Sequence, residues 1–318
     1  QWLYNYAAAD EGWQRLESSS LAQGWSWYSW PNAHDPAINA WHLLIRTDTQ
    51  WAVKLTTEEW SRFGHSSGTV APASDFIPVA AGTLPDESIF GPLAIEAFSM
   101  SNLEVTWGEW KAVRDEAASR GYDIENAGEG CAEDHPVHSV NWYEVAKWCN
   151  LKSEIEGLEP VYLYNGVPFR EAEPDNRYVR ANYSANGYRL PYETEWEYAG
   201  LGAGLSNGYT YSGSNDIATV AWYFSNSGGA TCDISDGHGT WPVGEKMPNE
   251  LGLYDMTGNV AEWCSDSNGY WGFERRVRGG AWVSSPSNSV VLVESHYNVS
   301  PSSRRNYIGF RLARNAAD

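Results

Sequence analysis

Apolar and polar positions along the chain follow two periods, one typical of strands and one typical of helices. Two apolar runs, residues 41–46 and 51–55, flank the polar tetrapeptide 47–50, and this arrangement predicts a β-hairpin. Residues 76–79 and 95–104 also favour extended structure. The first third of the chain therefore carries mainly strand signals.

Three later segments carry helix signals. The first has Thr106 followed three residues later by a glutamate, then apolar positions three and four residues apart, and it is expected to end at Gly121. The second begins at Asn141 with the same pair spacing. The third is short, follows Pro191 and ends at Gly200. Beyond it we expect loops and short strands, without internal repeats.

The composition predicts an irregular fold with many turns. The 318 residues include 18 Trp and 19 Tyr but only 3 Met, together with 30 Gly and 15 Pro. Flat aromatic side chains bury much apolar area at a small cost in rotamer entropy, so they suit folds with few regular elements. We expect an α+β architecture in which a Trp-rich N-terminal extension, residues 1–73, is packed on or beside one main domain, residues 74–318.

The charge and the lack of long apolar runs argue against some partners. The formal net charge of -20 repels phosphate backbones, so no nucleic-acid partner is expected. No run approaches the ~18 apolar residues of a membrane span, and no signal peptide is recognisable. Because Gln1 is not an initiator residue, we expect a trimmed chain from which a leader or lipid-bearing segment has been removed.

The four cysteines do not form a metal or redox motif. They are Cys131, Cys149, Cys232 and Cys264, and no two of them are spaced as C-x-x-C. Zinc and thioredoxin-like sites are therefore not indicated. Zero, one or two disulfides are all compatible with the sequence.

Six segments resemble, in order, motifs of the formylglycine-generating enzyme and its bacterial relatives. They include GYRLPYETEWEYA at 187–199, NELGLYDMTGNVAEW at 249–263 and IGFRLAR at 308–314; the others lie at 98–113, 136–149 and 276–282. The resemblance covers residues 75–318. It implies a C-type lectin-like fold of the formylglycine-generating-enzyme type, with a few helices, short antiparallel strands and much irregular chain.

The same resemblance implies that the oxidase chemistry of those enzymes is absent. They use two active-site cysteines and a bound copper, and soft thiolates are the ligands that hold copper(I). Carried onto this chain, the cysteine positions fall on Ser284 and at or near Ser289. A hydroxyl has too high a pKa and is too hard a ligand to replace a thiolate, so we expect no catalytic residues and no copper. The alternative is an enzyme of this family with a different, metal-based centre.

Residues 283–307 differ in composition from the matched segments on either side. Eight of these 25 residues are Ser, three are Asn and two are Tyr, and none is Lys, Gln, Met or Trp. Small hydroxyl and amide side chains mixed with Tyr are typical of antibody-like binding loops. The alternative interpretation is a polar surface loop without a binding role.

The segment also resembles the variable region of proteins diversified by retroelements, such as the Treponema variable protein type. In that family, adenines of a repeated Asn codon are randomised within a fixed lectin-like frame, and every residue of 283–307 except Glu294 is reachable in this way. The spacing of Pro301 and Arg304 before Ile308 fits the family's ending. The resemblance implies a frame of Arg278, Gly279, Gly280, Trp282, Gly309, Phe310 and Arg311. It implies that an unidentified protein or glycan binds Val283, Ser284, Ser285, Ser287, Asn288, Ser295, Tyr297, Asn298, Val299, Ser300, Ser302, Ser303, Arg305, Asn306 and Tyr307.

Relatives of the family place a calcium ion at the turn that matches residues 253–263. Here the resemblance implies side-chain oxygens from Asp255 and Glu262 and carbonyl oxygens from Gly258 and Val260. Calcium takes six to eight oxygen ligands, so further groups would have to complete the site. The alternative is a tight turn stabilised by hydrogen bonds from an asparagine side chain, without an ion.

These observations together predict a non-catalytic ligand-binding protein with a diversified C-terminal surface. The family implies display outside a bacterial cell, with a lipid anchor added before trimming as one option. The sequence identifies neither the ligand, nor the oligomeric state, nor the role of residues 1–73.

Overall fold

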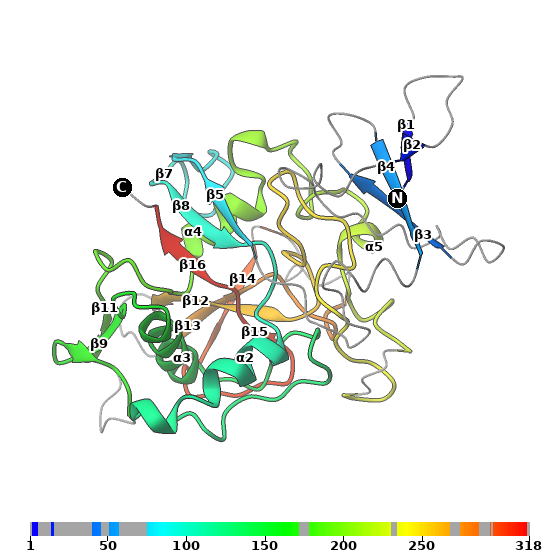
Figure 1. The fold of residues 1–318 in the computed structure, drawn as a ribbon. Coiled ribbons are helices and arrows are strands. Elements are labelled where there is room, and N and C mark those ends of the chain that lie inside the picture. Colours follow the sequence, from blue (N-terminus) through cyan, green and yellow to red (C-terminus); the bar gives the residue numbers. More distant parts are fainter. Residues whose placement is uncertain are drawn as a thin grey trace. The chain divides into compact units, whose positions relative to one another are not determined.

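The computed structural model (Figure 1) describes the backbone of four short strands before residue 75 and most of the chain after it. The later described residues are 75–171, 178–229, 234–267, 274–285, 293 and 295–316. The chain divides into two compact units, Gln1–Val70 and Ala71–Asp318.

The first unit contains a four-stranded antiparallel sheet with the order β2-β1-β4-β3. Strands β3 (Ala40–Ile45) and β4 (Trp51–Thr56) pair directly, which confirms the predicted hairpin. Strand β1 (Trp2–Asn5) pairs with β4 on one side and with β2 (Gln14–Arg15) on the other.

The longest helix of the second unit is α3 (Trp142–Ile155), which begins as predicted. Asn141 and Glu144 form a complete capping box: the Asn141 side chain accepts from the Glu144 N–H at 3.0 Å, and the Glu144 carboxylate accepts from the Asn141 N–H at 2.9 Å. Helix α4 (Glu193–Gly200) also lies where it was predicted. A short helix, α5 (Ile217–Val220), follows it and was not predicted.

The predicted length of the first helix is wrong. Helix α2 (Trp107–Arg114) begins after Thr106 as expected but ends seven residues before Gly121, and a separate 3-10 turn, Ala118–Arg120, precedes that glycine. The chain tightens here because Ala117 and Tyr122 are both buried, and the Tyr122 N–H donates to the Ala117 carbonyl at 2.9 Å.

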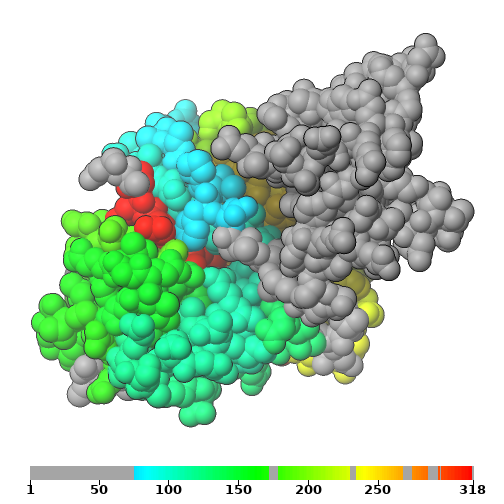
Figure 2. Space-filling model, viewed as in Figure 1, coloured from blue at the N-terminus to red at the C-terminus, as the bar shows by residue number. Residues whose placement is uncertain are grey.

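The strands toward the C-terminus of the chain belong to two sheets. The larger has the order β14-β13-β12-β15 and consists of β12 (Ala261–Ser267), β13 (Arg275–Arg278), β14 (His296–Val299) and β15 (Ile308–Gly309). The second has the order β16-β8-β5 and joins β16 (Ala313–Asn315), β8 (Phe98–Ser101) and β5 (Phe76–Val79). On the face in Figure 2, the red C-terminal residues accordingly lie against the cyan segment that contains β5.

Smaller pairings complete the second unit. Strands β9 (Tyr162–Tyr164), β10 (Val167–Pro168) and β11 (Val179–Ala181) form the sheet β10-β9-β11, and β6 (Gly82–Thr83) pairs with β7 (Ala94–Ile95). The predicted α+β fold with few helices and short strands is confirmed.

Tryptophans from distant segments form the core under these sheets. Trp110 of α2 and Trp148 of α3 stack with ring centroids 5.6 Å apart, and Phe310 meets both rings edge-on. Both indole nitrogens donate to backbone carbonyls, at 3.0 and 3.1 Å. Large rings with satisfied polar atoms thus replace the longer regular elements of other folds.

Candidate functional site

Trp282 fixes both ends of the candidate binding segment. Its backbone N–H donates to the Asn259 carbonyl at 2.8 Å, and its own carbonyl accepts from the Ser227 hydroxyl at 2.9 Å. Its indole N–H donates to the Asn306 carbonyl at 3.2 Å. Because Trp282 is only 2% exposed, residues 283–285 and the chain just before Ile308 are held around one buried indole.

The predicted ligand-binding residues that the structure describes all have solvent-accessible side chains. Val283, Asn298, Ser300, Ser302 and Arg305 are exposed. The half-buried ones are Ser284, Ser285, Ser295, Tyr297, Val299, Ser303, Asn306 and Tyr307. Ser287 and Asn288 lie outside the described residues.

Buried frame residues lie within and directly after this segment. Pro301, Ile308, Gly309, Phe310 and Arg311 are all buried. A Cβ at Gly309 would lie 2.4 Å from the Val137 carbonyl oxygen, so this position requires glycine. Gly279 and Gly280 instead have positive φ angles of 90° and 71°. The predicted reasons for the frame glycines, close backbone approach and positive φ, are both confirmed.

Hydrogen bonds attach the backbone of the segment to the scaffold. The carbonyls of Pro301 and Arg305 accept from the N–H groups of Trp142 and Ser139, at 3.0 and 2.9 Å. The Ala261 N–H donates to the Tyr307 carbonyl at 2.9 Å. With its main chain bound inward, the segment presents side chains to solvent, and β14 is the one regular element among its described residues.

A charged contact joins the segment to the start of α3. Arg304 forms an ion pair with Glu144, and its Nε donates to the second carboxylate oxygen at 3.1 Å. Glu144 also caps the helix through Asn141. Arg304, part of the matched ending, therefore orients the loop instead of serving as a free contact.

Strand β14 forms one edge of its sheet and carries three candidate residues, Tyr297, Asn298 and Val299. Asn298 lies opposite Arg276, whose Nη1 donates to the Asn298 side-chain oxygen at 2.7 Å. Tyr297 and Val299 pack against the core with part of each side chain. Burial raises the pKa of the Tyr297 hydroxyl, so it remains a neutral hydrogen-bonding group.

Ser284, to which the resemblance carries an active-site cysteine, is bound to the scaffold through its hydroxyl and its carbonyl. The Ser284 hydroxyl accepts from the Ala281 N–H at 3.0 Å, and its carbonyl accepts from the Phe224 N–H at 3.0 Å. Ser289 lies outside the described residues. Cys149 and Cys264 are free but fully buried in the core, and burial raises the pKa of both thiols. Cys131 is disulfide-bonded.

One predicted calcium ligand, Glu262, forms a buried ion pair with Arg311. Arg311 Nε donates to Oε1 and Oε2 of Glu262, at 2.9 and 2.7 Å. Arg311 Nη2 also donates to Oε1, at 2.7 Å. The Trp196 indole donates to Oε2 at 2.6 Å. Glu262 and Arg311 are each 0% exposed, so the guanidinium already supplies the positive charge beside this carboxylate.

Other groups of the same turn are also engaged. One Asp255 oxygen accepts from the Gly244 N–H at 2.7 Å, while the other is buried without a hydrogen-bond partner. Burial raises the pKa of Asp255 to about 6. The Val260 N–H donates to Glu104 at 3.0 Å, and Gly258 adopts φ 87° against the Trp222 carbonyl. Of the two predicted carboxylate ligands, only Asp255 has an oxygen without a hydrogen-bond partner, and the calcium site stays a prediction.

The acidic residues at the start of α4 have partners that local sequence did not indicate. Glu193 lies 3.1 Å from both Arg276 and Arg278, and Glu197 lies 2.6 Å from Arg278. Glu193 also lies in the first turn of α4, where the helix dipole favours negative charge, so it interacts with both the helix and the arginines. The arginines stand in the matched RVRGG segment, which was the one available signal for these contacts.

Comparisons with known proteins agree with this geometry. Residues 54–316 match the sulfatase-modifying factor enzyme 1-like domain. Chaperone protein LppX of Paenibacillus barcinonensis is 34% identical over 252 residues, which are 71% of this chain and 85% of that protein. Inactive C-alpha-formylglycine-generating enzyme 2 of Bos taurus is 35% identical over 147 residues, 43% of this chain and 48% of that relative.

Two solved structures share the fold over most of their length. CarF superposes with a TM-score of 0.66 and 27% identity, covering 77% of this chain and 99% of CarF. Treponema denticola variable protein 1 superposes with a TM-score of 0.62 and 30% identity, covering 79% of this chain and 98% of that protein. The predicted C-type lectin-like fold and the resemblance to both kinds of protein are confirmed, and the chain belongs to the sulfatase-modifying factor enzyme 1-like family, that of the formylglycine-generating enzyme.

Proposed function

We propose that this chain is a non-catalytic ligand-binding protein whose recognition surface consists of residues 283–285, 295, 297–300, 302–303 and 305–307. The observation that carries the proposal is that every candidate residue the structure describes is exposed or half-buried, while Pro301 within the segment and residues 308–311 directly after it are buried. An ordinary mobile loop would not need so many main-chain hydrogen bonds to the scaffold. A surface that must accept many sequences does need them, because its fold cannot depend on its own side chains.

The absence of catalysis is part of the proposal. By the resemblance, the cysteine positions of the oxidase fall on Ser284 and at or near Ser289, and one relative is named an inactive enzyme. A different metal-based centre would need clustered ligands. Within the described residues, no group of three or more His, Cys, Asp or Glu could hold a metal ion.

The proposed partner is a protein or glycan outside the cell. A disulfide at Cys131 is compatible with an oxidising compartment. In the described part of the chain, no helix has the length and apolarity to span a bilayer. We treat the Trp-rich residues 1–73 as an extension separate from the recognition surface.

Diversification of the segment tests the proposal. In one library, the exposed residues of the recognition surface are randomised; in a matched library, exposed residues of the 115–121 turn are randomised instead. Selection of both against two unrelated folded proteins should yield binders mainly from the first library, with melting temperatures close to that of the parent. Equal yields from both libraries would refute the assignment. In the genome, a near-copy of the coding region for 283–311 beside a reverse transcriptase gene is expected.

A second candidate function, that of a chaperone, is favoured by the relative LppX, which is similar over most of its length. A chaperone holds unfolded chains through exposed apolar surface, and Ile89, Phe90 and Leu93 are exposed between β6 and β7. If this function holds, the protein will suppress aggregation of heated citrate synthase. The double variant Ile89→Ser/Leu93→Ser will then lose that effect, whereas Ser300→Tyr will keep it.

A further inference from the structure

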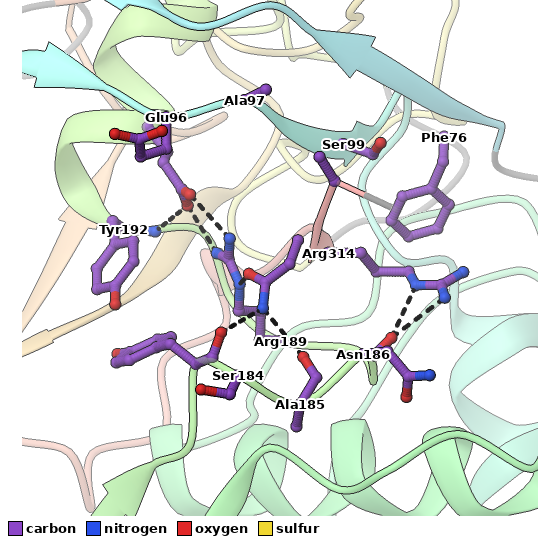
Figure 3. A pocket seen from close by; sticks show the side chains of 14 residues that line it. Phe76, Glu96, Ala97, Ser99, Ser184, Ala185, Asn186, Arg189, Tyr192 and Arg314 are labelled. Carbon is purple, nitrogen blue, oxygen red and sulfur yellow. Dashed lines mark hydrogen bonds and ion pairs between the residues drawn. The ribbon is translucent and has the colours of Figure 1, made fainter. Parts of the chain in front are cut away.

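A second concave site lies on a different sheet from the recognition surface. A pocket of about 900 Å³ is lined by residues of β5, β8 and β16 and by the chain that leads into α4 (Figure 3). This volume is of the size that holds small organic ligands. None of its lining residues belongs to 283–307, so the recognition surface does not account for it.

Aromatic rings form part of the pocket wall. The rings of Tyr183 and Tyr192 lie 4.4 Å apart with a tilt of 35°, and Phe76 stands on the opposite side in Figure 3. Tyr183 is 37% exposed, so part of its side chain is open to solvent. These ring faces provide flat apolar area at the mouth of an otherwise polar pocket.

The pocket floor is a guanidinium that is already fully engaged. Arg189 donates from Nη1 and Nη2 to the two oxygens of Glu195, at 2.6 and 2.8 Å, and from Nε to the Asn315 side chain at 3.0 Å. It is 2% exposed and lies 5.3 Å from the Tyr192 ring centre. Because Glu195 neutralises it, Arg189 is a rigid planar polar surface and not a binding site for an anion.

The rim is polar and carries no net charge. Arg314 donates from Nε and Nη2 to the Asn186 carbonyl, at 3.2 and 3.1 Å, as Figure 3 shows. The lining also includes Glu96. The charges of Arg314 and Arg189 and those of Glu96 and Glu195 therefore sum to zero. Hydroxyl and amide groups of Ser99, Ser184 and Asn186 supply the remaining polar contacts.

We propose that this pocket binds a neutral pyranose sugar. A pyranose has an apolar face of C–H groups, which suits exposed Tyr183, and a rim of hydroxyls, which suits fixed amide, hydroxyl and carboxylate groups. A phosphate or sulfate would meet the carboxylates of Glu96 and Glu195 as well as the two arginines, so the lining gives an anion no net attraction. A purely apolar ligand would displace water from the polar groups of the rim without replacing its hydrogen bonds, which costs free energy. The pocket and its ligand do not depend on the recognition surface.

Saturation-transfer NMR on the full chain tests the proposal. The probes are the methyl glycosides of glucose, galactose and mannose, N-acetylglucosamine, and glucuronate as an anionic comparison, all at millimolar concentration. We expect at least one neutral probe to receive saturation at its ring C–H protons. Ala97→Trp, which fills the pocket from an exposed lining position, should weaken its binding at least tenfold, as should Tyr183→Ala.

The matched control is Ala94→Trp, which adds the same ring at an exposed position that does not line the pocket. Circular dichroism melts establish that each variant is folded. Binding that survives in Ala97→Trp, binding of glucuronate alone, or no transfer to any neutral probe would each overturn the proposal. Variants of residues 298–302 should leave sugar binding unchanged.

Discussion

The indole nitrogen of Trp282 and the carbonyl oxygen of Asn306, 24 residues apart in the chain, are 3.2 Å apart in the fold. This bond joins the two ends of the segment that we assign to recognition. The same tryptophan is bonded to Ser227 and Asn259, so a single frame residue connects the segment to two other parts of the scaffold. Its loss should therefore affect more than local packing.

Trp282→Phe retains most of the ring and removes the indole N–H. We expect the free energy of unfolding to fall by about 1–2 kcal/mol, because the Asn306 carbonyl loses its donor in a partly buried place. Urea denaturation measures the change. Val283→Ala, at the exposed neighbouring position, serves as the control and should remain within about 0.5 kcal/mol of the parent. Equal effects of the two changes would contradict the anchoring role.

The buried pair Arg311–Glu262 provides a second test. Arg311→Met leaves Glu262 without its cation next to Glu104 and Asp255, so unfolding should become easier by about 3–5 kcal/mol. Lys111→Met, which breaks an ion pair with Glu133 at the surface, should cost at most about 1 kcal/mol. A small loss in Arg311→Met would mean that the carboxylates are neutral in the folded protein.

Local signals in the sequence predicted the elements that local contacts create. Asn141 and Glu144 are three residues apart, so the start of α3 was visible in the sequence. Arg278 and Glu197 are 81 residues apart, and no pattern in one sequence indicates that they form a buried pair. The end of α2 was missed for the same reason, since it depends on where Ala117 and Tyr122 meet the core.

The recognition segment was found by composition and resemblance, yet its geometry required the fold. Its serines and asparagines suggested a tolerant surface, but the contact between Phe224 and Ser284 joins residues 60 apart and had no sequence signal. The calcium prediction met a similar limit. The turn motif was present, but whether Glu262 faces an ion or Arg311 is decided by the position of the C-terminal strand.

Calcium addition distinguishes these two states of the turn. With Arg311 on both oxygens of Glu262, we expect millimolar calcium to leave the melting temperature unchanged, and chelation with EDTA to leave it unchanged as well. Differential scanning fluorimetry is sufficient. A calcium-dependent rise in the melting temperature that is lost in Asp255→Asn would instead establish the calcium site that the family resemblance implies.

His138 should make the stability depend on pH. Burial lowers the pKa of His138 from 6.5 to about 4, against the opposing effect of Glu129. Between these two pH values the unfolded chain binds a proton that the folded chain does not, so the free energy of unfolding falls as the pH drops from 7 to 4. The full difference is about 3 kcal/mol. Urea melts at several pH values measure this change. For His138→Gln, the fall in the free energy of unfolding between pH 7 and pH 4 should be smaller by that amount. Parallel plots of this free energy against pH for parent and variant would exclude His138 as the cause.

The contrast between the accessible candidate residues and the buried frame leads to the most direct test of tolerance. Asn298→Ser, Ser300→Tyr and Ser302→Asn change exposed side chains whose neighbours hold the backbone, so each should alter the free energy of unfolding by less than about 0.5 kcal/mol. Ile308→Ser changes a fully buried frame residue and should cost about 3 kcal/mol or more. Melting temperatures of the four variants decide the matter. If the exposed changes prove as costly as Ile308→Ser, the segment cannot accept varied sequences, and a diversified recognition surface at this place in the fold is physically excluded.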